Sequence, residues 1–170
     1  MIKTSPCIII LMGVSGSGKS TIGKQVSSKL DIPFLEGDHF HSDKNKKKMN
    51  AGLPLSDQDR IPWLISLTEI IQNTQSDLLI SCSSLKKSYR KILTNHSNRT
   101  LFVHLSGSFD LIEKRLRERE DHFFNPMLLK DQFNTLESLE NGENGFEINI
   151  RPKIDLVVAE IIASLKVWLV

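Results

Sequence analysis

Short apolar runs alternate with amphipathic segments along the 170 residues of this chain. That alternation predicts an α/β fold in which helices flank a parallel sheet. Strands are predicted near Cys7–Met12, Ile32–Glu36, Leu78–Cys82, Leu101–Leu105 and Phe146–Ile150. Helices are predicted from about Lys19 to Leu30, Asp59 to Asn73, Lys86 to His96, Ser108 to Glu120, Met127 to Leu139, and Lys153 to the end.

Two polar stretches interrupt the alternation, His39–Leu55 after the second predicted strand and Asp121–Pro126 between two predicted helices. Polar connections of this kind lie at the surface, where binding and catalytic residues concentrate. We therefore predict that both are functional loops. The lysine run Lys46–Lys48 is interpreted as a solvated helix face rather than a patch for phosphate or nucleic acid.

Composition narrows the class of protein. Apolar residues make up 39% of the chain and charged residues 25%, with a formal net charge of +2, which indicates one compact domain over residues 1–170 and gives no sign of a nucleic-acid partner. The two cysteines are expected to stay reduced. The first apolar run is followed by Gly13–Ser20 rather than a signal-peptide cleavage site, and no run has the length of a membrane span. These features predict a cytoplasmic protein that does not engage membranes.

Gly13–Ser20 fits the pattern G-x-x-x-x-G-K-[ST] and lies directly between a predicted strand and a predicted helix. Glycines allow a tight loop whose backbone N–H groups point at phosphate oxygens, and the following helix adds the positive end of its dipole. Lys19 would reach the terminal phosphates, and the Ser20 hydroxyl would hold Mg²⁺. The predicted nucleotide-binding residues here are Gly13, Val14, Ser15, Gly16, Ser17, Gly18, Lys19, Ser20 and Thr21.

Nucleotide binding alone leaves the reaction open, because GTPases, motor ATPases and small-molecule kinases share this loop. The third predicted strand carries no carboxylate, unlike the strand that supplies an acid to Mg²⁺ in hydrolytic switches. Asp38 follows the second strand instead, so it would emerge at the same carboxyl edge of the sheet as the phosphate loop. It could accept the proton of an attacking hydroxyl, or hold that hydroxyl and a metal-bound water. The alternative is an aspartate that only caps its loop.

Residues spread over most of the chain resemble one family, the gluconate kinases, which phosphorylate D-gluconate with ATP. The block from Asp38 to Trp63 is the most specific part of the resemblance. The matching residues are Met12–Ser20; Gly37, Asp38, His41, Asn45, Lys48 and Met49; Gly52, Pro54, Leu55, Asp57, Asp59, Arg60, Pro62, Trp63 and Leu64; Cys82–Lys86, Tyr89 and Arg90; Phe102, Val103, Leu105 and Gly107; and Arg115, Leu116, Arg119, His122 and Phe123.

The resemblance implies a three-layer P-loop kinase fold like that of the nucleoside-monophosphate kinases, with a five-stranded parallel sheet and a lid. The substrate-side region would span about residues 39–73 and the lid about residues 119–130. ATP and Mg²⁺ are the implied cofactors. A homodimer is also implied. The last predicted helix has apolar positions around much of its circumference, and those that do not pack on the sheet could form the dimer interface.

Gluconate offers one carboxylate and a row of hydroxyls, so its site needs a cation and short polar groups. Arg60 is one candidate cation. Lys86 and Arg90 are spaced i, i+4 at the start of a predicted helix, so one helix face would present two positive charges near the carboxyl edge. Asp38 and His41 would face the hydroxyls, although His41 could equally be a plain loop histidine. The resemblance adds His122 and Gln132 near the substrate.

Arg115 and Arg119 resemble the lid arginines of nucleoside-monophosphate kinases. By that likeness Arg115 lies against the adenine and Arg119 touches the phosphates, which makes Lys19, Asp38 and Arg119 the predicted catalytic residues. Arg151, followed by Pro152, could flank the adenine. Arg117 is expected to be solvated. In the alternative, all three arginines of this helix pair with Glu113, Glu118 and Glu120 on its surface.

Three positions depart from the family pattern: Ser42 in place of proline, Asp131 in place of serine or threonine, and Ser138-Leu139 in place of proline. Ser42 is expected to loosen its loop, and Asp131 would weaken the binding of an anion if it faced the site. Phosphorylation of another small anionic acceptor therefore stays open, as does a catalytically idle nucleotide-binding domain. Shikimate is disfavoured because Cys82-Ser83-Ser84 stands where a shikimate kinase has a triple-glycine turn.

Overall fold

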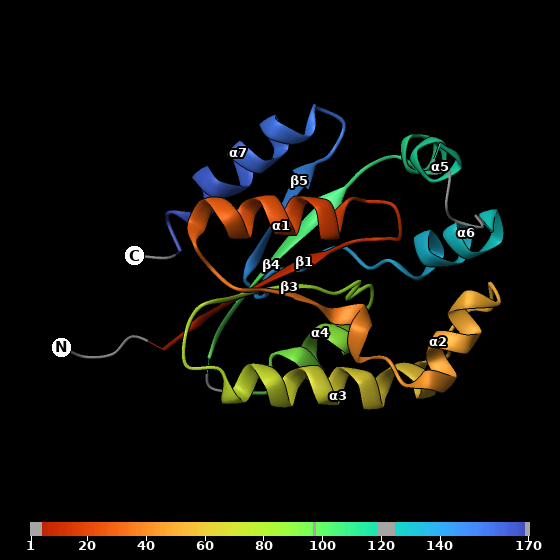
Figure 1. Cartoon of the computed structure of the whole chain (residues 1–170), viewed down its shortest axis with the longest axis horizontal. Helices are drawn as coiled ribbons and strands as arrows, with labels where there is room; N and C mark the ends of the chain where they lie inside the picture. Colours follow the sequence, from red (N-terminus) through yellow and green to blue (C-terminus); the bar gives the residue numbers. More distant parts are fainter. Residues whose placement is uncertain (1–4, 97, 119–124, 169–170) are drawn as a thin grey trace.

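The computed structural model describes residues 5–96, 98–118 and 125–168 of the chain. Within these ranges, a sheet of five parallel strands has the order β2-β3-β1-β4-β5 (Figure 1). The strands are β1 (Cys7–Met12), β2 (Phe34–Glu36), β3 (Leu78–Ser81), β4 (Arg99–Ser106) and β5 (Gly145–Asn149). The helices are α1 (Lys19–Leu30), the 3₁₀ helix η1 (Gly37–Phe40), α2 (Asp43–Asn50), α3 (Asp57–Asn73), α4 (Lys87–Leu93), α5 (Phe109–Arg117), α6 (Pro126–Thr135) and α7 (Ile154–Leu165).

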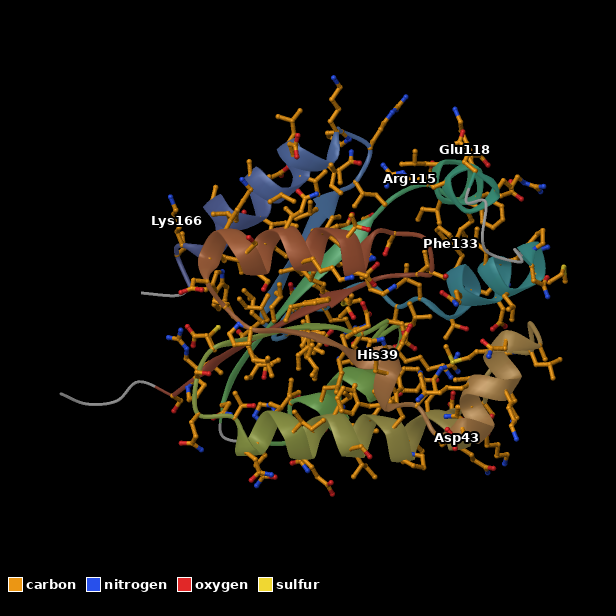
Figure 2. All side chains as sticks on the ribbon, in the orientation of Figure 1. His39, Asp43, Arg115, Glu118, Phe133 and Lys166 are labelled. Atoms are coloured by element: carbon orange, nitrogen blue, oxygen red, sulfur yellow. The ribbon has the colours of Figure 1, made fainter. Side chains whose placement is uncertain are left out.

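The helices form a layer on each face of the sheet. α1 and α7 lie over one face and α3 and α4 over the other, while α2, α5 and α6 gather beyond the carboxyl ends of the strands (Figure 1). Side chains fill the space between the sheet and both layers (Figure 2). The predicted three-layer α/β fold is confirmed, and the helices beyond the carboxyl edge enclose the region where parallel sheets bind ligands.

The central strand β1 explains why the first apolar run has no alternation. All six of its residues are buried. Ile9 and Leu11 pack into the core on the α1 and α7 side, while Ile8 and Ile10 pack against α3 and α4. A strand covered on both faces has no polar face, so its sequence is a continuous apolar run.

The predicted loop over His39–Leu55 is wrong in one respect, because it contains η1 and α2. Only a helix face at Lys46–Lys48 was predicted there, and the bounds of α2 were not, because the sequence DKNKKKMN has no apolar stripe. Its Ser42 is the N-cap, with the side chain accepting a hydrogen bond of 3.2 Å from the backbone of Asn45. An N-cap of this kind stabilises a helix by about 1 kcal/mol. Ser42 therefore stabilises the start of α2, whereas it was predicted to loosen this loop.

The lysine run is a solvated helix face for Lys46 and Lys47, which are exposed, as predicted. Lys48 differs, because its Nζ lies 2.6 Å from Oδ2 of Asp59. This contact holds the pKa of Asp59 well below its ordinary value. Asp59 also completes a capping box with Ser56, so α3 begins two residues earlier than predicted.

Several other helices and strands are shorter or longer than predicted. β2 begins at Phe34 rather than Ile32, and β4 extends over Arg99–Ser106. α4 ends at Leu93 and α6 at Thr135, several residues before the predicted ends. Helix ends depend on caps and tertiary contacts that periodicity does not report.

Both cysteines, Cys7 and Cys82, are free and buried. Burial raises the pKa of the Cys82 thiol to about 12. Among the described residues, no helix combines the length and the apolar character needed to cross a membrane.

Candidate active site

The phosphate loop lies between β1 and α1, where its motif requires it. Gly13, Gly16 and Gly18 have φ angles of +141°, +80° and +95°, a region that L side chains rarely adopt. A Cβ at Gly16 would lie 2.7 Å from Cγ of Leu116 on α5. The loop therefore depends on glycine for its backbone conformation and for the close approach of α5.

Lys19 and Ser15 show how the loop directs its polar groups. The Lys19 ammonium donates to the carbonyls of Gly13 and Val14 at 3.0 and 2.9 Å. The backbone N–H of Ser15 donates to Oε1 of Gln132 on α6 at 2.6 Å. An amide of this loop thus already binds an oxygen, which is what a phosphate cradle does.

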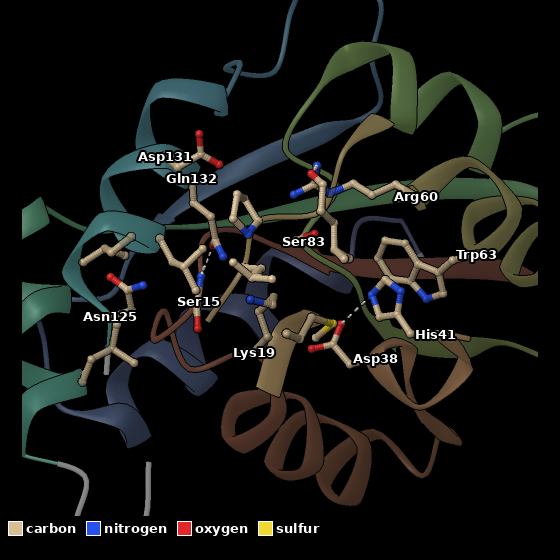
Figure 3. Close-up of a pocket in the computed structure, with 17 residues that line it drawn as sticks. Ser15, Lys19, Asp38, His41, Arg60, Trp63, Ser83, Asn125, Asp131 and Gln132 are labelled. Atoms are coloured by element: carbon tan, nitrogen blue, oxygen red, sulfur yellow. Dashed lines mark hydrogen bonds and ion pairs between the residues drawn. The ribbon is translucent and has the colours of Figure 1, made fainter. Parts of the chain in front are cut away.

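A cavity of about 260 Å³ opens beside the loop, at the carboxyl edge of the sheet. Lys19, Asp38 and His41 point into it, Gln132 approaches from α6, and Asn125 approaches from the N-cap of that helix (Figure 3). Its lining consists of Ser15, Lys19, Asp38, His41, Met49, Leu53, Pro54, Leu55, Arg60, Trp63, Ser83, Leu116, Asn125, Leu128, Leu129, Asp131 and Gln132.

Asp38 is held at the cavity by the backbone of Gly37. The Gly37 N–H donates to the Ser81 hydroxyl at 3.3 Å, and its carbonyl accepts from the Trp63 indole at 2.8 Å. A Cβ at Gly37 would lie 2.2 Å from the carbonyl oxygen of Ser81. This close contact between the first residue of η1 and the end of β3 places Asp38 at the carboxyl edge, as predicted.

His41 is more buried than a loop histidine, with 6% of its surface exposed. Its ring stacks on Trp63, with centroids 3.9 Å apart and an angle of 22° between the planes. Nε2 lies 3.9 Å from Oδ1 of Asp38. Burial lowers the pKa of His41, and the Asp38 carboxylate partly opposes that shift. His41 and Asp38 therefore line the cavity as a pair.

Arg60 reaches the cavity from the first turns of α3. Its Nη1 donates to the carbonyl of Leu55 and lies 3.5 Å from the Tyr89 hydroxyl. Tyr89 in turn donates to Asp57. These contacts hold the guanidinium beside the cavity, where it is a cation able to bind a carboxylate.

The other predicted cations, Lys86 and Arg90, do not share a face turned to the cavity. Lys86 precedes the first residue of α4 and pairs with Asp57, with Nζ 2.8 Å from Oδ1. Arg90 is 1% exposed, and its guanidinium donates to Glu143 through Nε at 2.6 Å and Nη2 at 2.8 Å. Carbonyls of Ser84, Leu85, Glu137 and Ser138 take its remaining N–H groups.

Neither Lys86 nor Arg90 therefore lines this cavity, and the predicted helix face with two free positive charges is not formed. The spacing i, i+4 requires both residues to be helical, and Lys86 is not. Arg90 instead ties the connection between α6 and β5 to α4. The Ser138-Leu139 departure lies in that connection, where the Ser138 carbonyl accepts from Arg90 at 3.1 Å.

A second cavity, also of about 260 Å³, flanks the same loop on the side of α5 and α7. Arg115 lies beside it and donates through Nη2 to the carbonyl of Ile150 at 2.7 Å (Figure 2). Arg151 is exposed and does not line it, whereas Pro152 does. The lining is Gly16, Gly18, Thr21, Ile22, Arg115, Ile150, Pro152, Ile154 and Val157.

The alternative in which Arg115, Arg117 and Arg119 pair with glutamates on the helix surface is confirmed for Arg117. Arg117 is exposed and pairs with Glu113 at 3.0 Å. Arg115 is directed at Ile150 instead. Arg119 and His122 lie outside the described residues.

Three residues of the first cavity were missed as functional candidates. Trp63 stacks on the ring of His41. Asn125 is the N-cap of α6. Ser83 follows β3 at the carboxyl edge, and its carbonyl accepts from the Gly13 N–H at 3.1 Å. The rule that singled out Asp38, position after a strand of a parallel sheet, also applies to Ser83.

Comparison with known proteins identifies the family. A family model for shikimate kinase matches residues 15–151. A probable gluconokinase of Dictyostelium discoideum is 43% identical over 178 residues, covering 96% of this chain and 88% of that protein. The thermoresistant gluconokinase of Escherichia coli K12 is 42% identical over 163 residues, covering 94% and 93%. The chain belongs to the gluconokinase family.

Solved structures agree with that membership. The crystal structure of a gluconokinase from Sinorhizobium meliloti 1021 has a TM-score of 0.88 and 36% identity, covering 96% of this chain and 93% of the other. A shikimate kinase from Acinetobacter baumannii has a TM-score of 0.56 and 16% identity, which shows the fold alone. The gluconokinase family consists of phosphotransferases, so the chain is an enzyme with a P-loop kinase fold.

Proposed function

We propose that this enzyme transfers the terminal phosphoryl group of ATP to the 6-hydroxyl of D-gluconate, giving 6-phospho-D-gluconate. The observation that carries the proposal is that Lys19, Asp38 and Arg60 line one cavity. They supply a cation for the transferred phosphoryl, a carboxylate for the attacking hydroxyl and a cation for the acid end of the acceptor. The gluconokinases among its relatives support the same reaction.

The nucleotide is proposed to bind along Gly13–Thr21. Its phosphates would accept from the loop amides and from Lys19, and its adenine would occupy the second cavity between Arg115 and Pro152, with Arg151 at the rim. The loop around Gly16 fits phosphates, because the positive φ angles of its glycines allow the backbone N–H groups to point inward. Arg119, outside the described residues, is proposed to touch the phosphates from a lid over about residues 119–130.

Ser20, at the start of α1, is the proposed protein ligand of Mg²⁺. The described residues contain no group of three or more His, Cys, Asp or Glu side chains that could hold a metal ion. The hydroxyl oxygen of Ser20 fits Mg²⁺, which in kinases is bound by few protein oxygens together with phosphates and water. When bound, Mg²⁺ offsets the negative charge of the phosphates.

The acceptor is proposed to bind within the region of about residues 39–73, with its carboxylate on Arg60. Asp38 accepts a hydrogen bond from the attacking hydroxyl, orients it and takes its proton during transfer. His41 and Gln132 also bind hydroxyls of the acceptor, and His122 adds a contact from outside the described residues. Asp131 also lines this cavity, so it adds a negative charge that gluconate has to tolerate.

A coupled assay of ADP release with Mg²⁺ tests the proposal, comparing D-gluconate, shikimate, related sugar acids and no acceptor. Turnover with gluconate alone, with a 6-phosphate product identified by ³¹P NMR, is expected. Turnover with a different acceptor only would overturn the specificity, and ATP binding without turnover would overturn the reaction.

The variant Asp38→Asn tests the role of the carboxylate. We expect kcat to fall by about 10²- to 10⁴-fold, with the affinity for ATP retained. Asp155→Asn is the matched control, because Asp155 is an exposed aspartate in the first turn of α7.

We also propose that the enzyme is a cytoplasmic homodimer of a single domain. Two free buried thiols fit a reducing compartment. Leu156 on α7 and Val167 after it are 61% and 81% exposed, and a second copy would remove this apolar surface from water. Sedimentation velocity of the wild type and of Leu156→Glu tests the dimer, which the variant is expected to weaken.

A further inference from the structure

Asn45 is an unusual residue for its helix. Within α2, all of which is described, it is the buried residue, 3% exposed, while the others are exposed or half-buried. A buried amide is retained only where its donors and acceptors find partners. The partners of Asn45 therefore indicate what it does.

Both contacts of Asn45 involve the amide nitrogen. Nδ2 lies 2.7 Å from the backbone carbonyl of Asp59 and 3.3 Å from Nδ1 of His41. A carbonyl oxygen can only accept, so the atom facing Asp59 has to be the nitrogen. The same nitrogen then donates to Nδ1 of His41, which has to be the unprotonated ring nitrogen. In the neutral ring the proton is on Nε2.

The direction of this Nε2–H bond is fixed by the surrounding residues. The His41 ring stacks on Trp63, and the Trp63 indole is itself held by its hydrogen bond to the Gly37 carbonyl. Nε2 faces Asp38, 3.9 Å from Oδ1. Both side chains line the cavity next to Lys19 (Figure 3). A donor and an acceptor are thus presented side by side.

The charges around His41 favour the neutral ring. Arg60 on α3 and Lys46 on α2 oppose its protonation, Asp38 on η1 favours it, and burial outweighs that attraction and lowers the pKa. A neutral ring has one proton, so the hydrogen bond from Asn45 decides which nitrogen carries it.

We infer that Asn45 is a positioning residue that holds His41 as the Nε2–H tautomer, so that His41 and Asp38 together bind one hydroxyl of the acceptor. The hydroxyl oxygen accepts from Nε2 and the hydroxyl proton is donated to Asp38. An oxygen about 2.8 Å from each atom fits the 3.9 Å separation of Nε2 and Oδ1. A group that only accepts, such as a carboxylate, leaves Asp38 unsatisfied there.

This inference rests on the proposed function only for the identity of the hydroxyl, so its first test does not use activity. Long-range ¹H–¹⁵N NMR of the whole chain, with the His41 signals assigned from His41→Gln, reports which ring nitrogen is protonated. We expect a protonated Nε2 in the absence of acceptor. A protonated Nδ1, or a mixture of tautomers, would overturn the inference whether or not the protein phosphorylates gluconate.

The second test is Asn45→Asp. A carboxylate only accepts, so Nδ1 has to donate, and the neutral ring then turns a bare Nε2 toward Asp38. The KM for gluconate is expected to rise about tenfold at pH 8, as for one lost hydrogen bond, with the KM for ATP unchanged. At lower pH the imidazolium regains Nε2–H, so the KM should return toward that of the wild type.

Asn50→Asp is the matched control, since it makes the same chemical change at the exposed end of α2. It is expected to leave the KM unchanged at every pH. A rise in the KM of Asn45→Asp that does not depend on pH would indicate loss of structure and overturn the positioning role. If that variant does not fold, the NMR measurement on the wild type still decides the tautomer.

Discussion

The backbone N–H of Ser15 in the phosphate loop donates to the side chain of Gln132 on α6, 117 positions away in sequence, at 2.6 Å. Under the proposed binding of the nucleotide along Gly13–Thr21, a phosphate oxygen would compete with the Gln132 amide oxygen for this N–H. We then expect nucleotide binding to break the hydrogen bond between Ser15 and Gln132.

Replacement of Gln132 by methionine, which has a similar shape and no amide, removes the competitor. We expect the affinity of the acceptor-free enzyme for an unreactive ATP analogue to rise about 2- to 10-fold, the value of one hydrogen bond. Isothermal titration calorimetry measures it. Gln72→Met on the exposed face of α3 is the control, and weaker nucleotide binding by Gln132→Met would contradict competition.

Replacing Gly16 or Gly142 by alanine distinguishes the backbone strain of a positive φ angle from the steric clash of an added Cβ. Their φ angles are +80° and +96°, but a Cβ at Gly16 meets Leu116 at 2.7 Å, whereas a Cβ at Gly142 meets nothing within 4 Å. Gly142→Ala should lower the free energy of unfolding by about 1 kcal/mol. Gly16→Ala should lower it by about 2–4 kcal/mol, because overpacking adds to the strain, and should also weaken ATP binding. Urea unfolding measures both, and equal losses would show that the contact with α5 is unimportant.

Arg60 and Lys86 were both predicted as acceptor cations, and only Arg60 lines the cavity. Arg60→Met should raise the KM for gluconate about 10- to 100-fold, because a charged hydrogen bond to a carboxylate is lost, with little change in the KM for ATP. Lys86→Met removes an exposed ion pair with Asp57, a kind of contact that contributes little even to stability. Because Lys86 does not line the cavity, either KM should change less than about 2-fold. Steady-state kinetics at saturating ATP compares them, and a larger effect from Lys86 would contradict this assignment.

Arg90 and Glu143 form a buried ion pair, with exposed fractions of 1% and 13%. Arg90→Met leaves the Glu143 carboxylate without its charged partner and removes the side-chain donor from four backbone carbonyls, so the free energy of unfolding should fall by about 3–5 kcal/mol. The KM values of the folded fraction should not change. A raised KM for gluconate in a protein of unchanged stability would restore Arg90 as an acceptor residue.

The same pair predicts how stability depends on pH. The hydrogen bonds from Arg90 lower the pKa of Glu143 below its ordinary value of 4.5. The stabilisation is therefore complete above the unfolded-state value and is lost as the pH falls through the lower folded-state pKa. Glu143→Gln should flatten the pH dependence of urea unfolding below about pH 4.5, and an unchanged slope would contradict the assignment.

The sequence alone was sufficient for the phosphate loop, the sheet and the position of Asp38. Each depends on local information: glycines at fixed spacing, an uninterrupted apolar run for a doubly covered strand, and the rule that parallel strands end at one edge. α1 was predicted at its observed bounds, Lys19–Leu30, because the phosphate loop fixes where it begins.

Tertiary structure decided the roles of individual polar residues. Lys86 and Arg90 follow the pattern of a charged helix face, yet a partner 53 positions away, Glu143, makes Arg90 part of the core. Asn45 stands in a helix with no apolar stripe, and its role depends on contacts with Asp59 and His41. Periodicity indicates which face of an element is buried, whereas the partner of a buried polar group depends on which elements pack together, and that is determined only when the chain folds.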